Sequence, residues 1–125
     1  MLIFIIKANV LPGQVEVLQR QMEETTARIN QNEPGYALYL HFNPDQTIVT
    51  FVNLATDTDA LANHFAEASK YPEASQRLFS SIQIVSVNVY GNLTPEAEAL
   101  LRPIVSPINL EYIAPQSGTF DRLIS

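Results

Sequence analysis

The chain of 125 residues contains no cysteine and no tryptophan, and its 7 lysines and arginines are outnumbered by 13 acidic residues. Without cysteine there is no disulfide, no thiolate metal ligand and no cysteine nucleophile. The formal net charge of −6 argues against the basic face that nucleic-acid binding requires. No apolar run approaches the roughly 20 residues that span a bilayer. We therefore expect neither a nucleic-acid partner nor a membrane partner.

The first residues do not have the pattern of a secretion signal. Met1 to Ile6 is apolar, but Lys7 interrupts the run too early for a signal peptide, and no small-residue cleavage pattern follows. We expect a cytoplasmic protein that is long enough to bury a genuine core. The two histidines are not at the spacing of metal ligands. We accordingly expect no metal and no cofactor.

Hydrophobic periodicity predicts the order β-α-β-β-α-β, which is the ferredoxin-like arrangement of an α+β domain, over residues 1–91. The continuous apolar run at the start is typical of a central strand. In chain order the expected elements are a strand from Leu2 to Ile6, a helix from Pro12 to Asn32, strands from Tyr36 to Phe42 and from Thr47 to Leu54, a helix from Thr56 broken at Pro72, and a strand from Ile82 to Tyr90.

Residues 92–125 form an extension, which we expect to pack on the same domain or on a partner subunit. Thr94-Pro95-Glu96 predicts the start of a helix, with a cap, a proline and an acidic first turn. Pro103 favours extended or turn conformations after it. We expect a short strand from Ile108 to Ile113, and a terminal segment from Gly118 to Ser125 that packs back onto the body.

His64 is the sharpest candidate for chemistry. It lies on the apolar stripe of the second predicted helix, beside Leu61 and Phe65, and should therefore face the sheet. Imidazole titrates near neutrality, and burial favours its neutral, basic form. Two interpretations stay open: a catalytic base, or a core histidine whose one hydrogen bond is satisfied.

Other polar residues lie on the two strands of the predicted hairpin. Asn53 stands mid-strand among apolar residues, so its amide needs a partner from the backbone, from water or from a ligand. Strict alternation places Tyr36 on one face of its strand and Tyr39 with His41 on the other. His41 lies either at the mouth of a cavity or at a solvated strand end.

Aromatic side chains are candidates for a substrate pocket. Tyr36, Phe51 and Phe65 belong to this group, although aromatic residues are also ordinary components of protein cores. The charged residues of the first helix lie off its apolar stripe, and we expect all of them to face solvent. They are Glu16, Arg20, Glu23, Glu24 and Arg28.

Two short motifs resemble the antibiotic biosynthesis monooxygenase family, a branch of the dimeric α+β barrel proteins. They are Glu33-Pro34-Gly35 followed by Tyr39, and Ala60-Leu61-x-x-His64. The resemblance implies a homodimer that acts without a cofactor on a small aromatic or quinone-like molecule. It also implies His64 as the base, with Asn53 and Tyr39 as hydrogen-bond donors to the substrate.

The chain departs from the family at a Glu-x-Trp pair, because Asn53 and Ala55 occupy those two places. This departure argues against haem degradation, which relies on the tryptophan. Three functions stay open. The first is a monooxygenase-like enzyme, the second is a non-catalytic small-molecule-binding or stress-associated barrel, and the third is an isomerase-type relative that transfers protons without oxygen.

Overall fold

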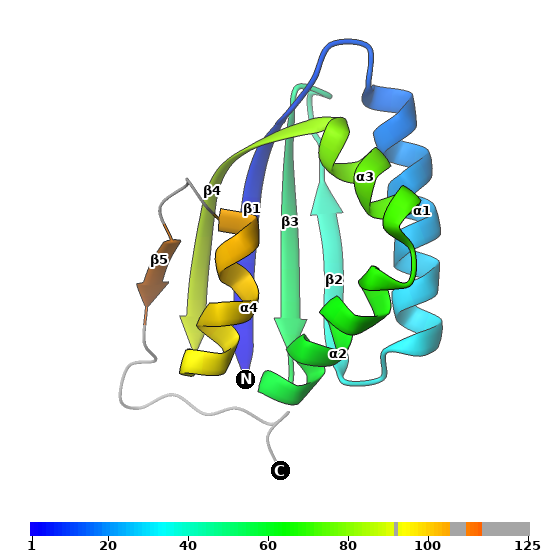
Figure 1. The fold of residues 1–125 in the computed structure, drawn as a ribbon. Coiled ribbons are helices and arrows are strands. Elements are labelled where there is room, and N and C mark those ends of the chain that lie inside the picture. Colours follow the sequence, from blue (N-terminus) through cyan, green and yellow to red (C-terminus); the bar gives the residue numbers. More distant parts are fainter. Residues whose placement is uncertain (92, 106–109, 114–125) are drawn as a thin grey trace.

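The computed structural model describes residues 1–91, 93–105 and 110–113 (Figure 1). In these ranges the chain forms a five-stranded sheet and four helices. The elements are β1 (Leu2–Val10), α1 (Val15–Asn32), β2 (Tyr36–Phe42), β3 (Ile48–Ala55), α2 (Thr58–Ser69), α3 (Pro72–Ser80), β4 (Ile82–Gly91), α4 (Pro95–Val105) and β5 (Leu110–Ile113).

The strands lie in the order β2-β3-β1-β4-β5, with β1 at the centre. β1 pairs antiparallel with β3 and with β4, and β2 pairs antiparallel with β3, whereas β5 runs parallel to β4. The predicted ferredoxin-like α+β fold is therefore confirmed. β1 extends to Val10 and is longer than the apolar run that predicted it.

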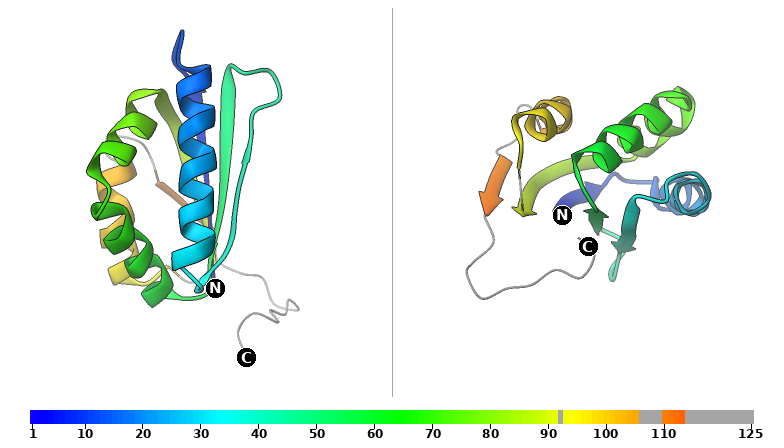
Figure 2. Two further views of the ribbon diagram at one scale, coloured as in Figure 1. Left: turned by 90° about the vertical axis from the view of Figure 1, so that its right-hand side faces the viewer. Right: turned by 90° about the horizontal axis from the view of Figure 1, so that it is seen from below.

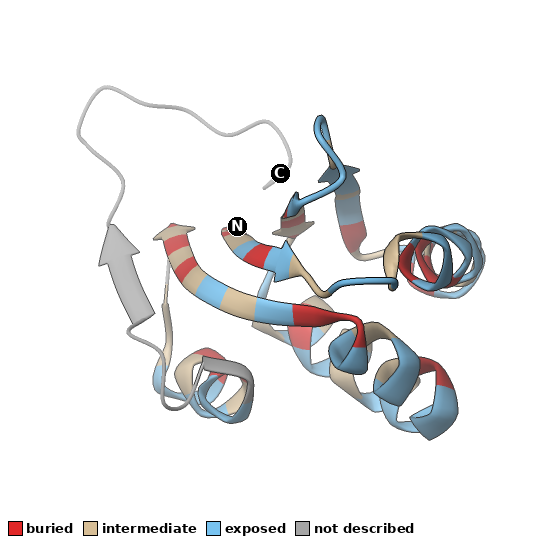
Figure 3. Ribbon diagram, turned by 90° about the horizontal axis from the view of Figure 1, so that it is seen from above, coloured by how far each residue is buried: buried red, intermediate tan, exposed pale blue. Residues whose placement is uncertain are grey.

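All four helices lie on the same face of the sheet, as the two views of Figure 2 show. Their apolar stripes meet the sheet in two core clusters. Buried residues alternate with less buried ones along β3 and along parts of β1 and β4 (Figure 3). The first cluster joins Leu2 and Phe4 of β1 to Leu61 of α2 and Leu101 of α4. The second joins Leu18 and Met22 of α1 to Val49 and Phe51 of β3.

β2 departs from strict alternation near its start. Its register against β3 shifts between Tyr36 and Leu38, so that one extra residue is accommodated there. Tyr36 and Tyr39 consequently both face the helices, and they pack with ring centroids 6.3 Å apart. The prediction that these two tyrosines occupy opposite faces is wrong, because a bulge changes the phase of the alternation.

α4 begins at Pro95, as predicted, and places Ala97 and Leu101 in the core. The expectation of an extended conformation from Pro103 is wrong, since the helix continues through this residue to Val105. Proline so near the end of a helix removes one backbone hydrogen bond without interrupting the core-facing turns. Of the expected strand, the structure gives Leu110–Ile113. The segment Gly118 to Ser125 lies outside the described residues.

The other face of the sheet has no helix over it in the described part of the chain (Figure 2). On the edge strand β2 and its neighbour β3, large apolar side chains are exposed. They include Leu38, Leu40 and Phe42 of β2 and Ile48 of β3. Phe42 is 55% exposed. None of the described helices has the length and hydropathy to cross a membrane.

Candidate functional site

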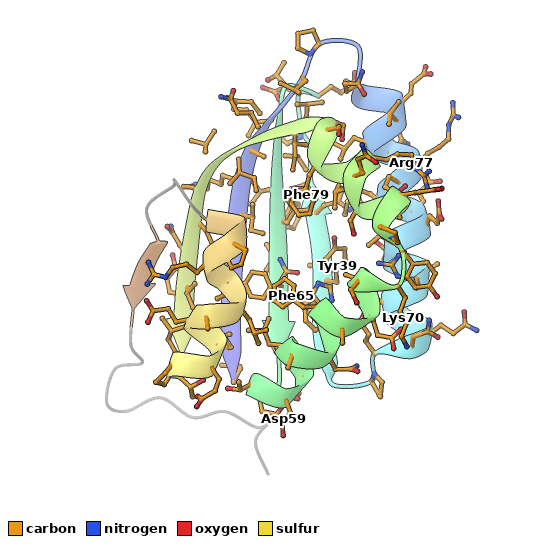
Figure 4. The ribbon with its side chains drawn as sticks, in the orientation of Figure 1. Tyr39, Asp59, Phe65, Lys70, Arg77 and Phe79 are labelled. Carbon is orange, nitrogen blue, oxygen red and sulfur yellow. The ribbon has the colours of Figure 1, made fainter. Side chains whose placement is uncertain are left out.

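A cavity of about 420 Å³ lies between the sheet and helices α1, α2 and α3. Most of its wall is apolar, and polar side chains come from every neighbouring helix. Figure 4 shows two of the lining aromatics, Tyr39 and Phe65, over the middle of the sheet and a third, Phe79, above them. The lining residues are Phe4, Ile6, Thr25, Arg28, Tyr39, Phe51, Asn53, His64, Phe65, Ala68, Ser69, Pro72, Ser75, Leu78, Phe79 and Ile82.

His64 of α2 forms a short hydrogen bond with Glu33, whose carboxyl Oε1 lies 2.7 Å from its Nδ1. The Glu33 side chain is only 1% exposed. An ionised carboxylate accepts hydrogen bonds only, so Nδ1–H donates and the lone pair of the neutral ring lies on Nε2. For Nε2 the described residues provide no hydrogen-bond partner. A carboxylate that holds a histidine in this way orients the ring and leaves Nε2 able to accept a proton.

The two sequence motifs that contain Glu33 and His64 lie against each other in space. A Cβ placed on Gly35 would lie 2.9 Å from the Cβ of Ala60, so only glycine lets the start of β2 approach α2 so closely. The Asp57 side chain caps α2 by accepting a hydrogen bond from the backbone N–H of Ala60 at 2.8 Å. These contacts fix the position of α2 and therefore of His64.

Asn53 of β3 is buried and lines the cavity. Its Oδ1 accepts a hydrogen bond from the Tyr36 hydroxyl at 3.0 Å, and its Nδ2 lies 3.5 Å from the backbone carbonyl of Phe4. An amide carries two N–H donors, so one remains for a ligand. Tyr36 itself stacks on the His64 ring, with centroids 4.3 Å apart. It therefore supports two lining residues from behind the cavity wall.

Tyr39 lines the cavity between the strands and α1. Burial raises the pKa of its phenol, an effect that the charge of Arg28 partly opposes and that of Glu33 reinforces. The raised pKa keeps the hydroxyl protonated, so it can donate a hydrogen bond. Its Oη lies 4.0 Å from the Met22 sulfur, and its ring centroid lies 6.4 Å from that of His64.

Arg28 of α1 also lines the cavity, although its helix position predicted a solvent-facing side chain. The guanidinium lies over the Tyr71 ring, 4.4 Å from the centroid. Its Nε is buried and has no hydrogen-bond partner in the described part of the chain. The prediction missed this residue because the wall that it faces is completed by α3, which is remote in sequence.

The remaining predicted residues divide into two groups. Phe51 and Phe65 line the cavity. His41 pairs in register with Phe51 but is exposed at the end of β2 and does not line the cavity. Glu33 was not singled out as a site residue, yet it lies in one of the two motifs and bonds to the histidine of the other.

Ala55, at the family's tryptophan place, is fully buried in the core. It is not among the residues that line the cavity. Within residues 1–91, 93–105 and 110–113, no group of three or more histidine and carboxylate side chains is arranged to hold a metal ion.

No protein-family model matches the chain, and no curated protein matches it. Solved structures do match. The fold is similar to that of MupZ from Pseudomonas fluorescens, with a TM-score of 0.72 and 16% identity over 99% of this chain and 97% of the other.

It is also similar to SnoaB, a cofactor-independent oxygenase from Streptomyces nogalater, with a TM-score of 0.60 and 14% identity over 74% of this chain and 93% of the other. A putative antibiotic biosynthesis monooxygenase from Caulobacter crescentus gives a TM-score of 0.58 and 17% identity over 70% and 86%. The chain therefore has the fold of the antibiotic biosynthesis monooxygenases, and the predicted resemblance is confirmed at the level of the fold.

Proposed function

We propose that this protein is a cofactor-independent, monooxygenase-like enzyme that binds a small aromatic or quinone-like molecule in the cavity, with His64 as the base. The observation that carries the proposal is the hydrogen bond of 2.7 Å between His64 and the buried Glu33, at the wall of a largely apolar cavity. The carboxylate orients the ring and stabilises its protonated form after proton transfer. The monooxygenase-like fold supports the same class.

The chemistry begins with transfer of an acidic proton from the substrate to Nε2 of His64. The resulting carbanion or phenolate is electron-rich and reacts directly with dioxygen. When a CH₂ group is converted to a carbonyl, one oxygen atom enters the product and the other leaves as water with both hydrogens, so no external reductant is needed. The free N–H of Asn53 and the hydroxyl of Tyr39 are suited to stabilise the developing oxyanion.

A second candidate is an oxygen-independent, isomerase-type proton transfer. The observation that favours it is the position of the Tyr39 phenol, which lines the same cavity as His64 with ring centroids 6.4 Å apart. A base and a neutral acid beside one ligand can move a proton from one atom to another without any oxidant. The lack of tryptophan, at a place where the resembled family relies on it, is consistent with such a reaction.

Oxygen uptake with anthrones, naphthols and hydroquinones tests the proposal. We expect uptake in the wild type and its loss in His64→Gln, while His41→Gln, an exposed histidine outside the cavity lining, behaves as wild type. Uptake that is equal in the wild type and His64→Gln would remove His64 from this chemistry. Turnover under nitrogen would favour the isomerase-type reaction. Ligand-induced thermal stabilisation without turnover would favour a binding protein.

We also propose that the protein is a homodimer in which the bare faces of two sheets pack together. This is supported by the exposed apolar side chains of β2 and β3 on a face that no described helix covers. Stacked sheets bury such faces at a spacing of about 10 Å. Light scattering at micromolar concentration should give a dimer mass, and Leu40→Lys should lower it. Val17→Lys, an exposed apolar position on α1, should not.

A further inference from the structure

A row of polar side chains runs along the cavity side of α1. Gln21 and Thr25 are buried, at 2% and 6% exposure, and Arg28 follows them at the spacing of one helix face. Gln21 Oε1 accepts a hydrogen bond from Arg77 Nε of α3 at 2.9 Å, and its Nε2 donates to Thr25 Oγ1 at 3.0 Å. These two bonds fix the orientation of the Gln21 side chain and hold the Thr25 hydroxyl in place.

The Thr25 hydroxyl is available as a hydrogen-bond donor. Its oxygen already accepts from Gln21, and the described structure gives no acceptor for its own O–H. Thr25 and Arg28 both line the cavity, three residues apart on α1. Ser75 of α3 lines the cavity as well. This wall thus offers hydrogen-bond donors and, in the form of Arg28, a permanent positive charge.

No carboxylate in the described part of the chain neutralises the charge of Arg28. Among the described residues its guanidinium forms no ion pair with a carboxylate, and its buried Nε lacks an acceptor. Burying a polar group without a partner is unfavourable, and more so for a charged one. The one described contact of the guanidinium is the face of the exposed Tyr71 ring, which cannot accept the Nε–H as an oxygen atom would.

We propose that Arg28 and Thr25 form an anion-binding end of the cavity, so that the ligand is an amphipathic molecule with an apolar body and an acidic group such as a carboxylate. The proposal rests on the proposed function, whose substrate class it narrows. The acidic group would accept from the guanidinium and the Thr25 hydroxyl, while the apolar body lies against Phe4, Phe51 and Phe65. His64 and Asn53 are then left to the reacting atoms.

The negative net charge of the protein makes a preference for acidic ligands a specific test of Arg28. At −6 the chain as a whole repels anions, so a preference for an acid over its neutral analogue must come from a local cation. We would measure the affinity of two matched pairs, 2-naphthoate with 2-naphthamide and octanoate with octanamide, by calorimetry at neutral pH. In the wild type we expect at least one acid to bind about tenfold more tightly than its amide.

The variants Arg28→Gln, Arg28→Lys and Arg20→Gln locate the effect. Arg28→Gln should abolish the preference for the acid, and Arg28→Lys should retain part of it. Arg20→Gln makes the same charge change at an exposed position of α1 and should leave the preference intact. A wild type without any preference overturns the proposal, and so does a preference that persists in Arg28→Gln.

A purely structural Arg28 gives a different pattern. If this residue only packs on Tyr71, Arg28→Gln leaves the ratio of acid to amide affinity unchanged, and a lower melting temperature is its only effect. Oxygen uptake with naphthols, which carry no carboxylate for Arg28 to bind, tests the proposed function separately. Uptake without an acid preference removes the anion site alone, and an acid preference without uptake or turnover removes the catalytic proposal alone.

Discussion

The two polar walls of the cavity are built in opposite ways. On the wall formed by α2 and the strands, Glu33, His64, Tyr36 and Asn53 hold one another through hydrogen bonds and ring stacking. On the α1 wall, Arg28 ends a row of hydrogen-bonded side chains but has no carboxylate partner in the described structure. The residues of the first wall bind mainly one another, although Glu33 Oε2, like Arg28 Nε, is buried without a hydrogen-bond partner in the described structure. On the second wall, by contrast, no described carboxylate pairs with the charge of Arg28. Changes to the first wall should therefore reduce stability more than changes to the second.

The largest expected effect comes from removing one member of the buried pair. His64→Ala leaves the Glu33 carboxylate buried without a partner, and we expect it to lower the free energy of unfolding by about 3–5 kcal/mol. Denaturant titration at neutral pH measures this loss. The double variant His64→Ala/Glu33→Gln should recover part of it, because the buried charge is gone. A double variant that is less stable than His64→Ala would contradict this account.

The contact between Gly35 and Ala60 should give the next largest effect. Gly35→Ala forces a Cβ to within 2.9 Å of the Ala60 Cβ, and we expect a loss of about 1–3 kcal/mol together with displacement of α2. Ala60→Gly in the same chain should restore part of the stability. Gly13→Ala is a useful comparison, since its φ of +77° is strained but no atom lies within 4 Å of the added group. It should cost about 1 kcal/mol and leave the cavity unchanged.

Tyr36→Phe tests the support behind the wall. It leaves Asn53 Oδ1 without its donor in a buried position, which should cost about 1–2 kcal/mol at neutral pH. Burial raises the pKa of the Tyr36 phenol well above its usual value. The stabilisation that the buried phenol provides is therefore fully present below the pKa of an unfolded tyrosine, about 10, and is lost progressively as the pH rises above that value. The difference in stability between wild type and Tyr36→Phe should accordingly narrow in alkali, and a widening difference would contradict the burial of a neutral phenol.

The smallest effect on stability is expected on the α1 wall. Arg28→Gln loses a contact with an exposed tyrosine ring, which is worth roughly 0.5–1 kcal/mol. Arg20→Gln, fully outside the cavity, should lie within about 0.5 kcal/mol of the wild type. Thermal and denaturant unfolding of both variants measure the two values. A loss at Arg28 as large as that at His64 would remove the contrast between the two walls.

The sequence predicted the elements well because each has a clear period or a strong boundary. Pro72 and Pro95 begin helices, and the apolar run from Leu2 lies in the central strand. The placement of His64 at the sheet also followed from its helix stripe. Periodicity predicts which face of a helix or strand a residue occupies, and the position of His64 depends on that face alone.

The missed features depend on contacts between distant segments. Glu33 lies 31 residues before the histidine that it bonds. Arg28 lies off the apolar stripe of α1, and only the docking of α3 makes that flank a cavity wall. Tyr36 faces the helices because of a local bulge, which strict alternation does not include.

The bulge at the start of β2 also bears on how this protein tolerates change in its gene. One extra residue between Tyr36 and Leu38 sets which residues of β2 face the helices. Deletion of a single codon there would therefore turn the side chains on one side of the deletion to the opposite face of the sheet. Either Tyr36 would leave its partner Asn53, or Tyr39 would exchange places with the apolar residues of the bare face. A point substitution at Ala37, whose side chain is exposed, leaves that phase intact. Homologous chains should therefore vary in the identity of this residue far more readily than in its presence.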